Sequence, residues 1–346
     1  MKQIALLFLL TLCLLLTGCG QRFVSGSVVQ QVPTETTGHT QFILRTPDGK
    51  EFGFLIQPGT EFFYQVPSES PQTGTTLDSP YEQQDLTDTM ANVYYTRSAK
   101  KLTGTNGQPV PTYKTDRVVI TYQRTGEKQL ADSTQLDIWT GTGGALYTTT
   151  DRVPLLLVQH FEPILPLTMN QGAKAKIEAF FANLSLYDLD ALLEQALAQH
   201  TANAQNAAEP AQANDISQFS HKTERVVYCS TSVSLPEKEY LFGWAFDKQT
   251  GTLLDNWDLF TCTEEQARDS IIELALKGST DNQLKAEMKQ ALQPEWLVFD
   301  PDALRIEFPA GSLPSESLSY HIRIAYSDGL DAFMQPWALP EDYNNT

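Results

Sequence analysis

Residues 246–262, FDKQTGTLLDNWDLFTC, decide how the C-terminal half folds, because three aspartates, a tryptophan and a cysteine fall within one short stretch. The stretch is either a metal loop or a turn between strands. Compared with a calcium-binding loop, Gly251 falls at position five and Thr252 occupies position six, where glycine is required. Asp and Gly have the roles expected in a tight turn instead. We therefore expect DKQTG (247–251) to close a hairpin and to hold no metal.

The segments around this hairpin predict a mixed α/β region. Thr263 followed by Gln266 is a capping box, which predicts a helix start. Strands are expected at 224–235 and 239–247, and two helices with apolar residues at i, i+3, i+4 and i+7 are expected from Asn170 onwards. Residues 200–215 lack large apolar side chains, which predicts a frayed helix end or a flexible loop.

The N-terminal part is rich in strand patterns. Residues 42–44 and 52–56 are apolar runs joined by TPDGK (46–50), which predicts a hairpin. A Ser-, Pro- and Gln-rich span, 67–88, predicts an exposed loop. The strands DRVVITY (116–122) and LDIW (136–139) follow, and Gly141, Gly143 and Gly144 after them predict a linker, since no phosphate-binding motif surrounds these glycines.

This order of hairpin, long loop and two later strands resembles the small five-stranded barrels of the oligonucleotide/oligosaccharide-binding (OB) type in bacterial exported lipoproteins. The expected fold class is therefore α+β. Residues 19–145 form a β-rich, OB-like barrel domain in this expectation. Residues 150–340 form an α+β domain with an antiparallel sheet and packed helices.

The first residues, MKQIALLFLLTLCLLLTGCG (1–20), predict export. The apolar run from Ile4 to Leu16 is shorter than the roughly 20 residues of a spanning helix, and it ends in small residues. LTGC (16–19) resembles the lipobox of bacterial lipoproteins, in which the cysteine is acylated. The resemblance implies a signal peptide over 1–18, lipidation of Cys19, and a chain anchored to the outer face of the cytoplasmic membrane.

Charge narrows the range of partners. The formal net charge is −18, and the chain without its signal, whose only charged residue is Lys2, has −19. This balance argues against nucleic acid and against direct adhesion to anionic lipid, and it favours cationic partners. Acidity that serves only solubility is the simpler explanation of the charge by itself.

Two cysteines remain after removal of Cys13 with the signal and lipidation of Cys19. Cys229 and Cys262 are an even pair in a compartment that permits oxidation. A disulfide and two buried free thiols both remain open. A zinc site is not expected, because there is no CxxC and no histidine at ligand spacing.

The C-terminal half resembles a known extracytoplasmic domain. The residues that carry the resemblance are FDKQTGTLLDNWDLFTCTEEQARDSIIELAL (246–276), WLVFDPDALRIEFPAG (296–311) and SYHIRIAYSDGLDAF (319–333). The domain is a domain of unknown function found in lysozyme-sensing anti-sigma factors and beside the catalytic domain of certain peptidoglycan deacetylases. Residues 155–199 resemble the strand and paired helices that precede it there. The resemblance implies a shared fold and an envelope role.

Two departures limit what the resemblance implies. The anti-sigma factors have a cytoplasmic segment and a membrane span, which the present sequence does not show after Cys19. The deacetylases have a metal-dependent catalytic domain, which the present sequence does not show either.

No catalytic constellation is evident in the sequence. HExxH, GxSxG and SxxK are all absent, and the histidines are scattered without partners at motif spacing: His39, His160, His200, His221 and His321. Asp188/Asp190 and Asp300/Asp302 fall where aspartate caps helices or bends turns. Trp244, Trp257, Trp296 and Trp337 form either a sugar-stacking platform or core aromatics.

The sequence therefore predicts a non-catalytic cell-surface lipoprotein without a cofactor. Its partners are expected to be the membrane, through the lipid on Cys19, and lysozyme or another cationic wall-active protein. The alternatives are a peptidoglycan- or glycan-binding envelope scaffold, and a wall hydrolase or deacetylase of unrecognised type.

Overall fold

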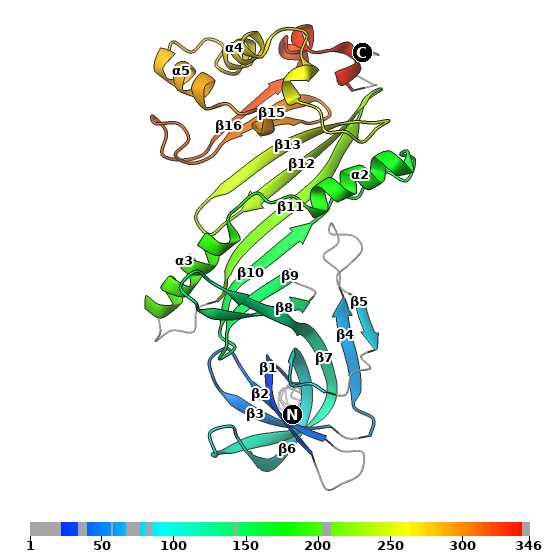
Figure 1. The fold of residues 1–346 in the computed structure, drawn as a ribbon, viewed down its shortest axis with the longest axis vertical. Coiled ribbons are helices and arrows are strands. Elements are labelled where there is room, and N and C mark those ends of the chain that lie inside the picture. Colours follow the sequence, from blue (N-terminus) through cyan, green and yellow to red (C-terminus); the bar gives the residue numbers. More distant parts are fainter. Residues whose placement is uncertain are drawn as a thin grey trace, which may run out of the picture. The chain divides into compact units, whose positions relative to one another are not determined.

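The computed structural model describes residues 22–33, 40–56, 58–66, 77–80, 85–141, 144–202 and 209–340. The chain divides into two compact units, which we call unit 1 (Met1–Leu155 and Leu193–Pro210) and unit 2 (Leu156–Leu192 and Ala211–Thr346). Strands predominate in both (Figure 1). The predicted signal peptide and Cys19 lie outside the described residues.

Unit 1 is built from strands. They are β1 (Arg22–Pro33), β2 (Thr40–Arg45), β3 (Glu51–Ile56), β4 (Glu61–Val66), β5 (Leu77–Pro80), β6 (Thr89–Thr103), β7 (Pro109–Gln129), β8 (Gln135–Gly141) and β9 (Gly144–Thr149). The predicted hairpin at 46–50 is confirmed: it joins β2 to β3, Thr46 N–H donates to the Lys50 carbonyl at 2.9 Å, and Gly49 has a positive φ of 79°.

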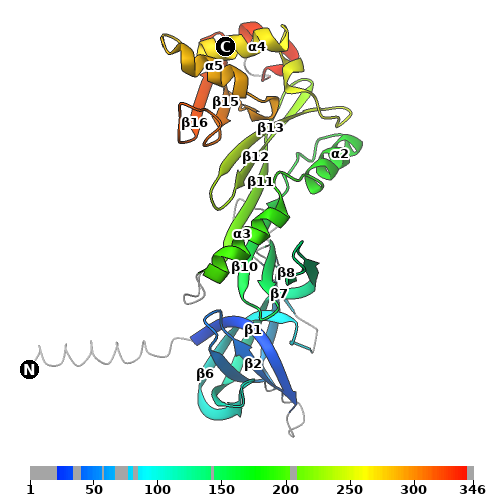
Figure 2. The same cartoon turned by 60° about the vertical axis from the view of Figure 1, so that its left-hand side comes forward.

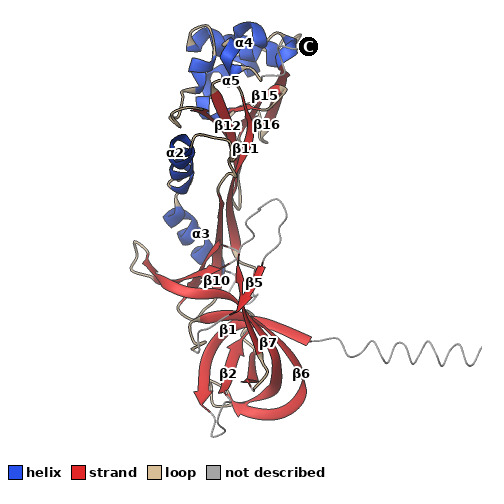
Figure 3. Cartoon of the chain, turned by 90° about the vertical axis from the view of Figure 1, so that its right-hand side faces the viewer, coloured by secondary structure: helices blue, strands red, loops and turns tan. Residues whose placement is uncertain are grey.

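The long strands β6 and β7 bend strongly (Figure 3). β6 pairs with β1 and β7, and β7 also pairs with β3, β4 and β8. The register between β6 and β7 shifts at three places, and β-bulges of this kind increase local bend and twist. The bent strands surround a core that includes Val28, Phe42, Phe54, Val118 and Ile120, all fully buried.

Unit 2 contains most of the helical structure. Its elements are β10 (Pro154–Phe161), α2 (Gln171–Ala182), α3 (Leu189–Ala202), β11 (Ala211–Lys222), β12 (Val226–Ser234), β13 (Glu239–Asp247), α4 (Glu264–Ala275), α5 (Asn282–Ala291), β14 (Leu297–Phe299), β15 (Ala303–Phe308) and β16 (Tyr320–Ala325), with short 3-10 turns between them. β10 begins in residues assigned to unit 1, and most of α3, residues 193–202, is also assigned to unit 1.

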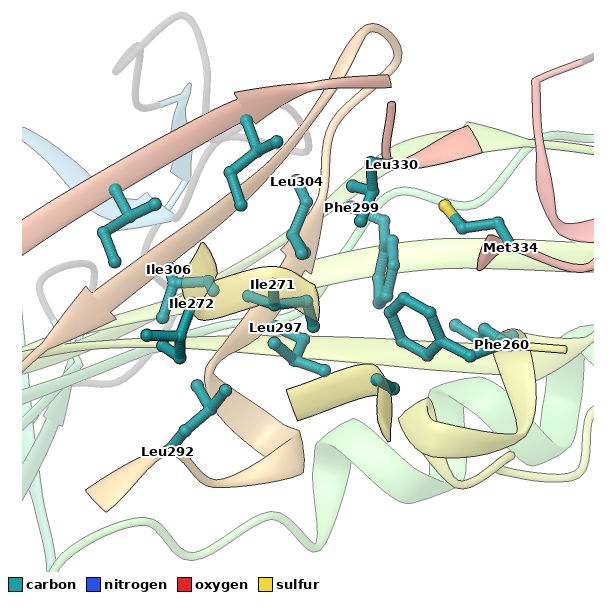
Figure 4. Packing of buried hydrophobic residues seen from close by; sticks show 14 of the residues in the cluster. Phe260, Ile271, Ile272, Leu292, Leu297, Phe299, Leu304, Ile306, Leu330 and Met334 are labelled. Atoms are coloured by element: carbon teal, nitrogen blue, oxygen red, sulfur yellow. The ribbon is translucent and has the colours of Figure 1, made fainter. Parts of the chain in front are cut away.

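The β11–β13 sheet of unit 2 is packed on both faces. On one face, α2 lies beside the strands (Figure 2), where Ile177 and Phe181 pack with Val227, Trp244 and Phe246. On the other face, Val226, Tyr228 and Ala245 join the core beneath α4, α5 and the β14–β15–β16 sheet. Figure 4 shows this second core, with Phe260, Phe299, Leu330 and Met334 gathered at one end.

The expected fold class is wrong. The structure is mostly β, with only four α-helices among the described residues, and β1–β13 form a mixed 13-stranded sheet instead of a small separate OB-like barrel followed by an α+β domain. β7 is the physical reason in unit 1: it continues for 21 residues and pairs with β8 beyond the other strands of its core. In unit 2 the sheet is not wholly antiparallel, because β10 and β11 run parallel.

Three local expectations also need correction. Residues 211–215, expected in a frayed helix end or flexible loop, begin β11, and residues 203–208 lie outside the described part. Gly141 and Gly144 are not in a linker but pair with each other where β8 turns into β9. The expected loop at 67–88 contains β5, which pairs with β4.

Helix starts agree with the sequence. The capping box of α4 is confirmed, since Thr263 accepts from the Gln266 backbone N–H and the Gln266 side chain accepts from that of Thr263. Asn170 caps α2. Within the described residues, no helix is long and apolar enough to cross a membrane.

Candidate functional site

The 247–251 turn is structural, as the sequence predicted. Asp247 Oδ1 accepts hydrogen bonds from the backbone N–H groups of Gln249 at 3.0 Å and Thr250 at 2.9 Å, and Gly251 adopts a φ of 69°. These hydrogen bonds lower the pKa of Asp247 despite partial burial, which acts in the opposite direction. In the described part of the chain, no group of three or more His, Cys, Asp or Glu side chains is placed to hold a metal ion.

A polar network lies on the face of the unit 2 sheet that α2 covers. His160 on β10 and Asp215 on β11 are register partners, and His160 Nδ1 hydrogen-bonds to the Asp215 carboxylate. Tyr187 donates to the other oxygen of Asp215 at 3.2 Å. The bond to Asp215 raises the pKa of His160, so the folded chain holds that proton more tightly. His160 is therefore a partnered strand histidine.

Two other histidines occupy contrasting places in unit 2. His221 stacks on Tyr228 with a ring-centroid separation of 4.7 Å, and burial lowers its pKa to about 4. His321 is exposed, and its Nδ1 lies 3.6 Å from a carboxylate oxygen of Glu307. His200 lies in α3, and His39 lies outside the described residues. The structure does not bring His160, His221 and His321 into one constellation.

The paired carboxylates have capping and turn roles. Asp188 Oδ1 accepts from the backbone N–H groups of Asp190 at 3.0 Å and Ala191 at 3.1 Å, at the start of α3. Asp300 pairs with Arg305 at 3.0 Å and Asp302 pairs with Arg323, at the turn between β14 and β15. These contacts satisfy the carboxylates structurally.

Cys229 and Cys262 are both free thiols. Cys229 is buried with Trp244 and Phe246 on the α2 face of the sheet, whereas Cys262 packs at the edge of the core on the other face. Burial raises the pKa of the Cys229 thiol well above its usual range, which makes that side chain inert at neutral pH.

The four tryptophans considered as a platform are split between two cores. Trp244 belongs to the α2 face, and Trp257, Trp296 and Trp337 pack in or against the core beneath α4 and α5. Arg268 lies over the Trp257 ring at 5.0 Å, and Arg225 lies over that of Trp337 at 4.7 Å. A shared sugar-stacking surface is not present among these four side chains.

Negative charge is concentrated in unit 2. This unit contains 26 of the 42 acidic residues and 12 of the 24 basic ones, a net charge of −14, whereas unit 1 has −4 over the same number of residues. Unit 2 therefore supplies most of the electrostatic attraction that the chain exerts on a cationic partner.

Three exposed carboxylates of unit 2, Asp258, Glu265 and Asp328, form what we call the acidic patch. Asp258 and Glu265 flank residues 259–261, whose backbone bonds to that of 333–335: Gln335 N–H donates to the Leu259 carbonyl and Thr261 N–H donates to the Phe333 carbonyl, both at 2.8 Å. Asp328 lies in the turn that Gly329 ends, near Leu274 of α4. Within the described residues none of the three carboxylates forms an ion pair. The patch is thus free to meet a partner's cations.

Nearby arginines do not cancel the patch. Arg268 pairs with Glu264 at 2.6 Å, and Arg305 and Arg323 pair with Asp300 and Asp302. The total charge follows from the sequence, but the set of exposed, unpaired carboxylates does not, because it includes residues more than 60 positions apart. The only advance signal was the excess of Asp and Glu after residue 246.

Comparison with known proteins gives only distant similarity to solved structures. No family model and no curated protein matches the chain. Among solved structures, it is similar to a DUF3298 family protein from Pseudomonas aeruginosa PAO1, with 18% identity over 49% of this chain and 78% of that chain and a TM-score of 0.28. It is also similar to a DUF3298 family member from Bacteroides fragilis NCTC 9343, with 10% identity over 62% and 93% and a TM-score of 0.34.

Both solved structures are described as DUF3298 family proteins. At these identities and TM-scores, no residue role is carried over to this chain.

Proposed function

We propose that this chain is a non-catalytic binding protein of the bacterial cell envelope, exported and held at the outer face of the cytoplasmic membrane by lipid on Cys19. Its unit 2 binds lysozyme or another cationic wall-active protein. The observation that supports this proposal best is the net charge of −14 in unit 2 against −4 in unit 1.

Electrostatic steering is the physical basis of the proposed binding. A strongly acidic surface raises the rate at which a basic protein meets it, and salt screens this attraction over about 8–10 Å. A single exposed ion pair contributes only about 0–1 kcal/mol, so useful affinity needs several carboxylates acting together. Asp258, Glu265 and Asp328 are suited to this because they are exposed and not already paired with cations.

The acidic patch can be tested by neutralising it in the chain 20–346. The variant Asp258→Asn/Glu265→Gln/Asp328→Asn keeps side-chain size and removes three charges. We expect its affinity for lysozyme, measured by calorimetry, to be about tenfold or more below that of the unaltered chain, since three exposed pairs of about 0.5 kcal/mol each are lost.

A matched control removes the same charge from unit 1. Glu61, Asp151 and Glu209 are exposed residues of unit 1, and their change to Gln, Asn and Gln alters the net charge equally. We expect less than about a threefold change in affinity. If both variants lost the same affinity for lysozyme, the overall charge of the chain, and not the acidic patch, would explain the binding. Unchanged binding in the patch variant would reject this surface.

A further inference from the structure

Unit 1 contains a pocket that the proposed function does not use. Its volume is about 320 Å³, and it lies among β1, β6, β7, the end of β2 and the turn that follows β9. Met90, Leu146, Pro47 and Pro154 supply apolar wall, and Ser25 and Asn92 lie at its polar side, joined by a hydrogen bond of 2.5 Å. A pocket of this size holds a small organic molecule.

The charge of this pocket is opposite to that of the chain. Arg45 and Arg152 are the charged residues among those that line it, and no acidic residue of the described chain lines it. Each arginine also has a carboxylate partner outside the lining: Arg45 lies 2.9 Å from Glu51, and Arg152 lies 4.0 Å from Asp88. The guanidinium donors that these contacts leave over favour an anion in the pocket. Burial lowers the pKa of Arg152, while the carboxylates of Asp88 and Asp137 act in the opposite direction.

The backbone holds Arg152 in a conformation that arginine rarely adopts. Its φ is 65°, in the turn where Arg152 N–H donates to the Thr149 carbonyl at 2.8 Å. Glycine or asparagine fits such a position with less strain. The guanidinium is fixed as well, since Nη1 donates to the Val28 carbonyl and the group lies 5.4 Å from the Trp139 ring centroid. Strained, fixed side chains are typical of binding sites.

Arg45 is held on the other side of the pocket. Its Nη2 donates to Glu51 at 2.9 Å and to Thr105 Oγ1 at 2.8 Å, and its Nε lies 3.3 Å from the same Glu51 oxygen. A guanidinium has five N–H donors in a planar fork, so both arginines keep donors beyond the contacts described. This fork matches the two oxygens of a carboxylate.

We propose that the pocket binds a small organic carboxylate, with its charged end between Arg45 and Arg152 and its apolar body against Met90 and Leu146. The site would give the chain a second ligand, of opposite charge to the partner of unit 2. The two proposals rest on different units and can fail separately.

Methionine methyl groups make the test site-specific. The chain 20–346 contains four methionines, of which Met90 lines the pocket and Met169, Met288 and Met334 lie in unit 2. With ¹³C-methyl methionine in this chain, we expect benzoate or hexanoate to shift the Met90 signal saturably and to leave the other three unchanged. Benzyl alcohol and hexanol, which lack the charge, should bind about tenfold or more weakly.

Variants separate the arginines from general effects. Arg152→Gly removes the guanidinium and the backbone strain together, and Arg45→Gln removes the second cation; each should weaken benzoate binding about tenfold or more. Lys50→Gln, an exposed cation of unit 1 that does not line this pocket, should leave binding unchanged. Thermal unfolding of each variant confirms that unit 1 is folded.

Three results would overturn the proposal: no saturable shift of Met90 with either carboxylate, equal binding of the alcohols, or undiminished benzoate binding in both folded arginine variants.

Discussion

At the scale of single residues, the polar side chains inside unit 2 are anchored by partners on neighbouring strands. Thr231 accepts from Trp244 Nε1 at 2.9 Å and shares a hydrogen bond of 2.8 Å with Ser217, on the sheet face that also carries the His160–Asp215 pair. Buried polar groups lower the stability of the fold little when each has a hydrogen-bond partner, and much more when one partner is removed. They fix the packing of this face.

The thiols give the first residue-scale prediction. In the chain 20–346, which contains only Cys229 and Cys262, we expect one thiol to react readily with a thiol reagent in the native state and the second only after unfolding. Cys262 is partly exposed, whereas Cys229 is 2% exposed. The measurement is a thiol titration with and without denaturant. A chain with no free thiols even when unfolded would indicate a disulfide and contradict the structure.

His221 gives a pH prediction. Its pKa is about 4 in the folded chain, because burial disfavours the charged ring, against an ordinary value of about 6.5 when unfolded. Between these values the unfolded chain binds more protons, so acid favours unfolding. Above about pH 6.5 the titration of His221 does not change the free energy of unfolding. By pH 4.5 it lowers that free energy by about 2–3 kcal/mol, since each pKa unit corresponds to about 1.4 kcal/mol.

The test compares urea unfolding of the unaltered chain and of His221→Phe, which keeps the stack on Tyr228, at pH 7.5 and 4.5. Tryptophan fluorescence reports mainly on unit 2, which contains four of the five tryptophans. On acidification from pH 7.5 to 4.5, the free energy of unfolding of His221→Phe should fall by about 2–3 kcal/mol less than that of the unaltered chain. The exposed His321→Gln variant serves as the control. Equal losses in the unaltered chain and His221→Phe would show that His221 is not the titrating group.

Residue roles set by local chain geometry are predictable from sequence, and those set by strand register are not. Asp247 and Asp188 were predicted in turn and capping roles, because their partners lie two or three positions away. The partnership of His160 with Asp215 spans 55 positions. It depends on β11, whose first residues, 211–215, the sequence predicted as a frayed helix end or a flexible loop.

At the scale of elements, α4 was predictable and β11 was not. The α4 start has a side-chain signature, Thr263 with Gln266, and an apolar stripe behind it. β11 contains few large apolar residues, so neither period 2 nor period 3.6 marks its beginning. Its first residues are in strand form because β10 pairs with them in parallel, which is a tertiary effect.

The close approach of β13 and β14 gives an element-scale prediction. A Cβ added at Gly243 would lie 1.9 Å from the Leu297 carbonyl oxygen, so the backbones must separate to admit any side chain. We expect Gly243→Ala to lower the free energy of unfolding of unit 2 by about 1–3 kcal/mol, the usual cost of overpacking. The measurement is urea unfolding followed by tryptophan fluorescence.

Gly126→Ala is the matched control for this change, because it too is a glycine in a strand but has no atom within 4 Å of the added Cβ. We expect a change of less than about 1 kcal/mol. If Gly243→Ala were as stable as this control, the packing of β14 against β13 would have to differ from that described.

At the scale of the whole molecule, the sequence predicted the acidity but not its placement. The net charge follows from composition alone, whereas its concentration in unit 2 depends on where the units divide, and unit 2 includes residues 156–192 as well as the C-terminal half. The prediction of the fold class was wrong at the same scale, because local sequence patterns do not show how many strands will join one sheet. Sheet extent is decided by edge pairing between distant segments.

The most direct test of the central claim is calorimetric titration of the chain 20–346 with lysozyme at low and at physiological salt. We expect saturable binding, micromolar or tighter, that persists at physiological salt and weakens steeply as salt is raised further. Absence of binding at low salt, where attraction to the −14 unit is strongest, would contradict it, and so would an affinity indifferent to salt.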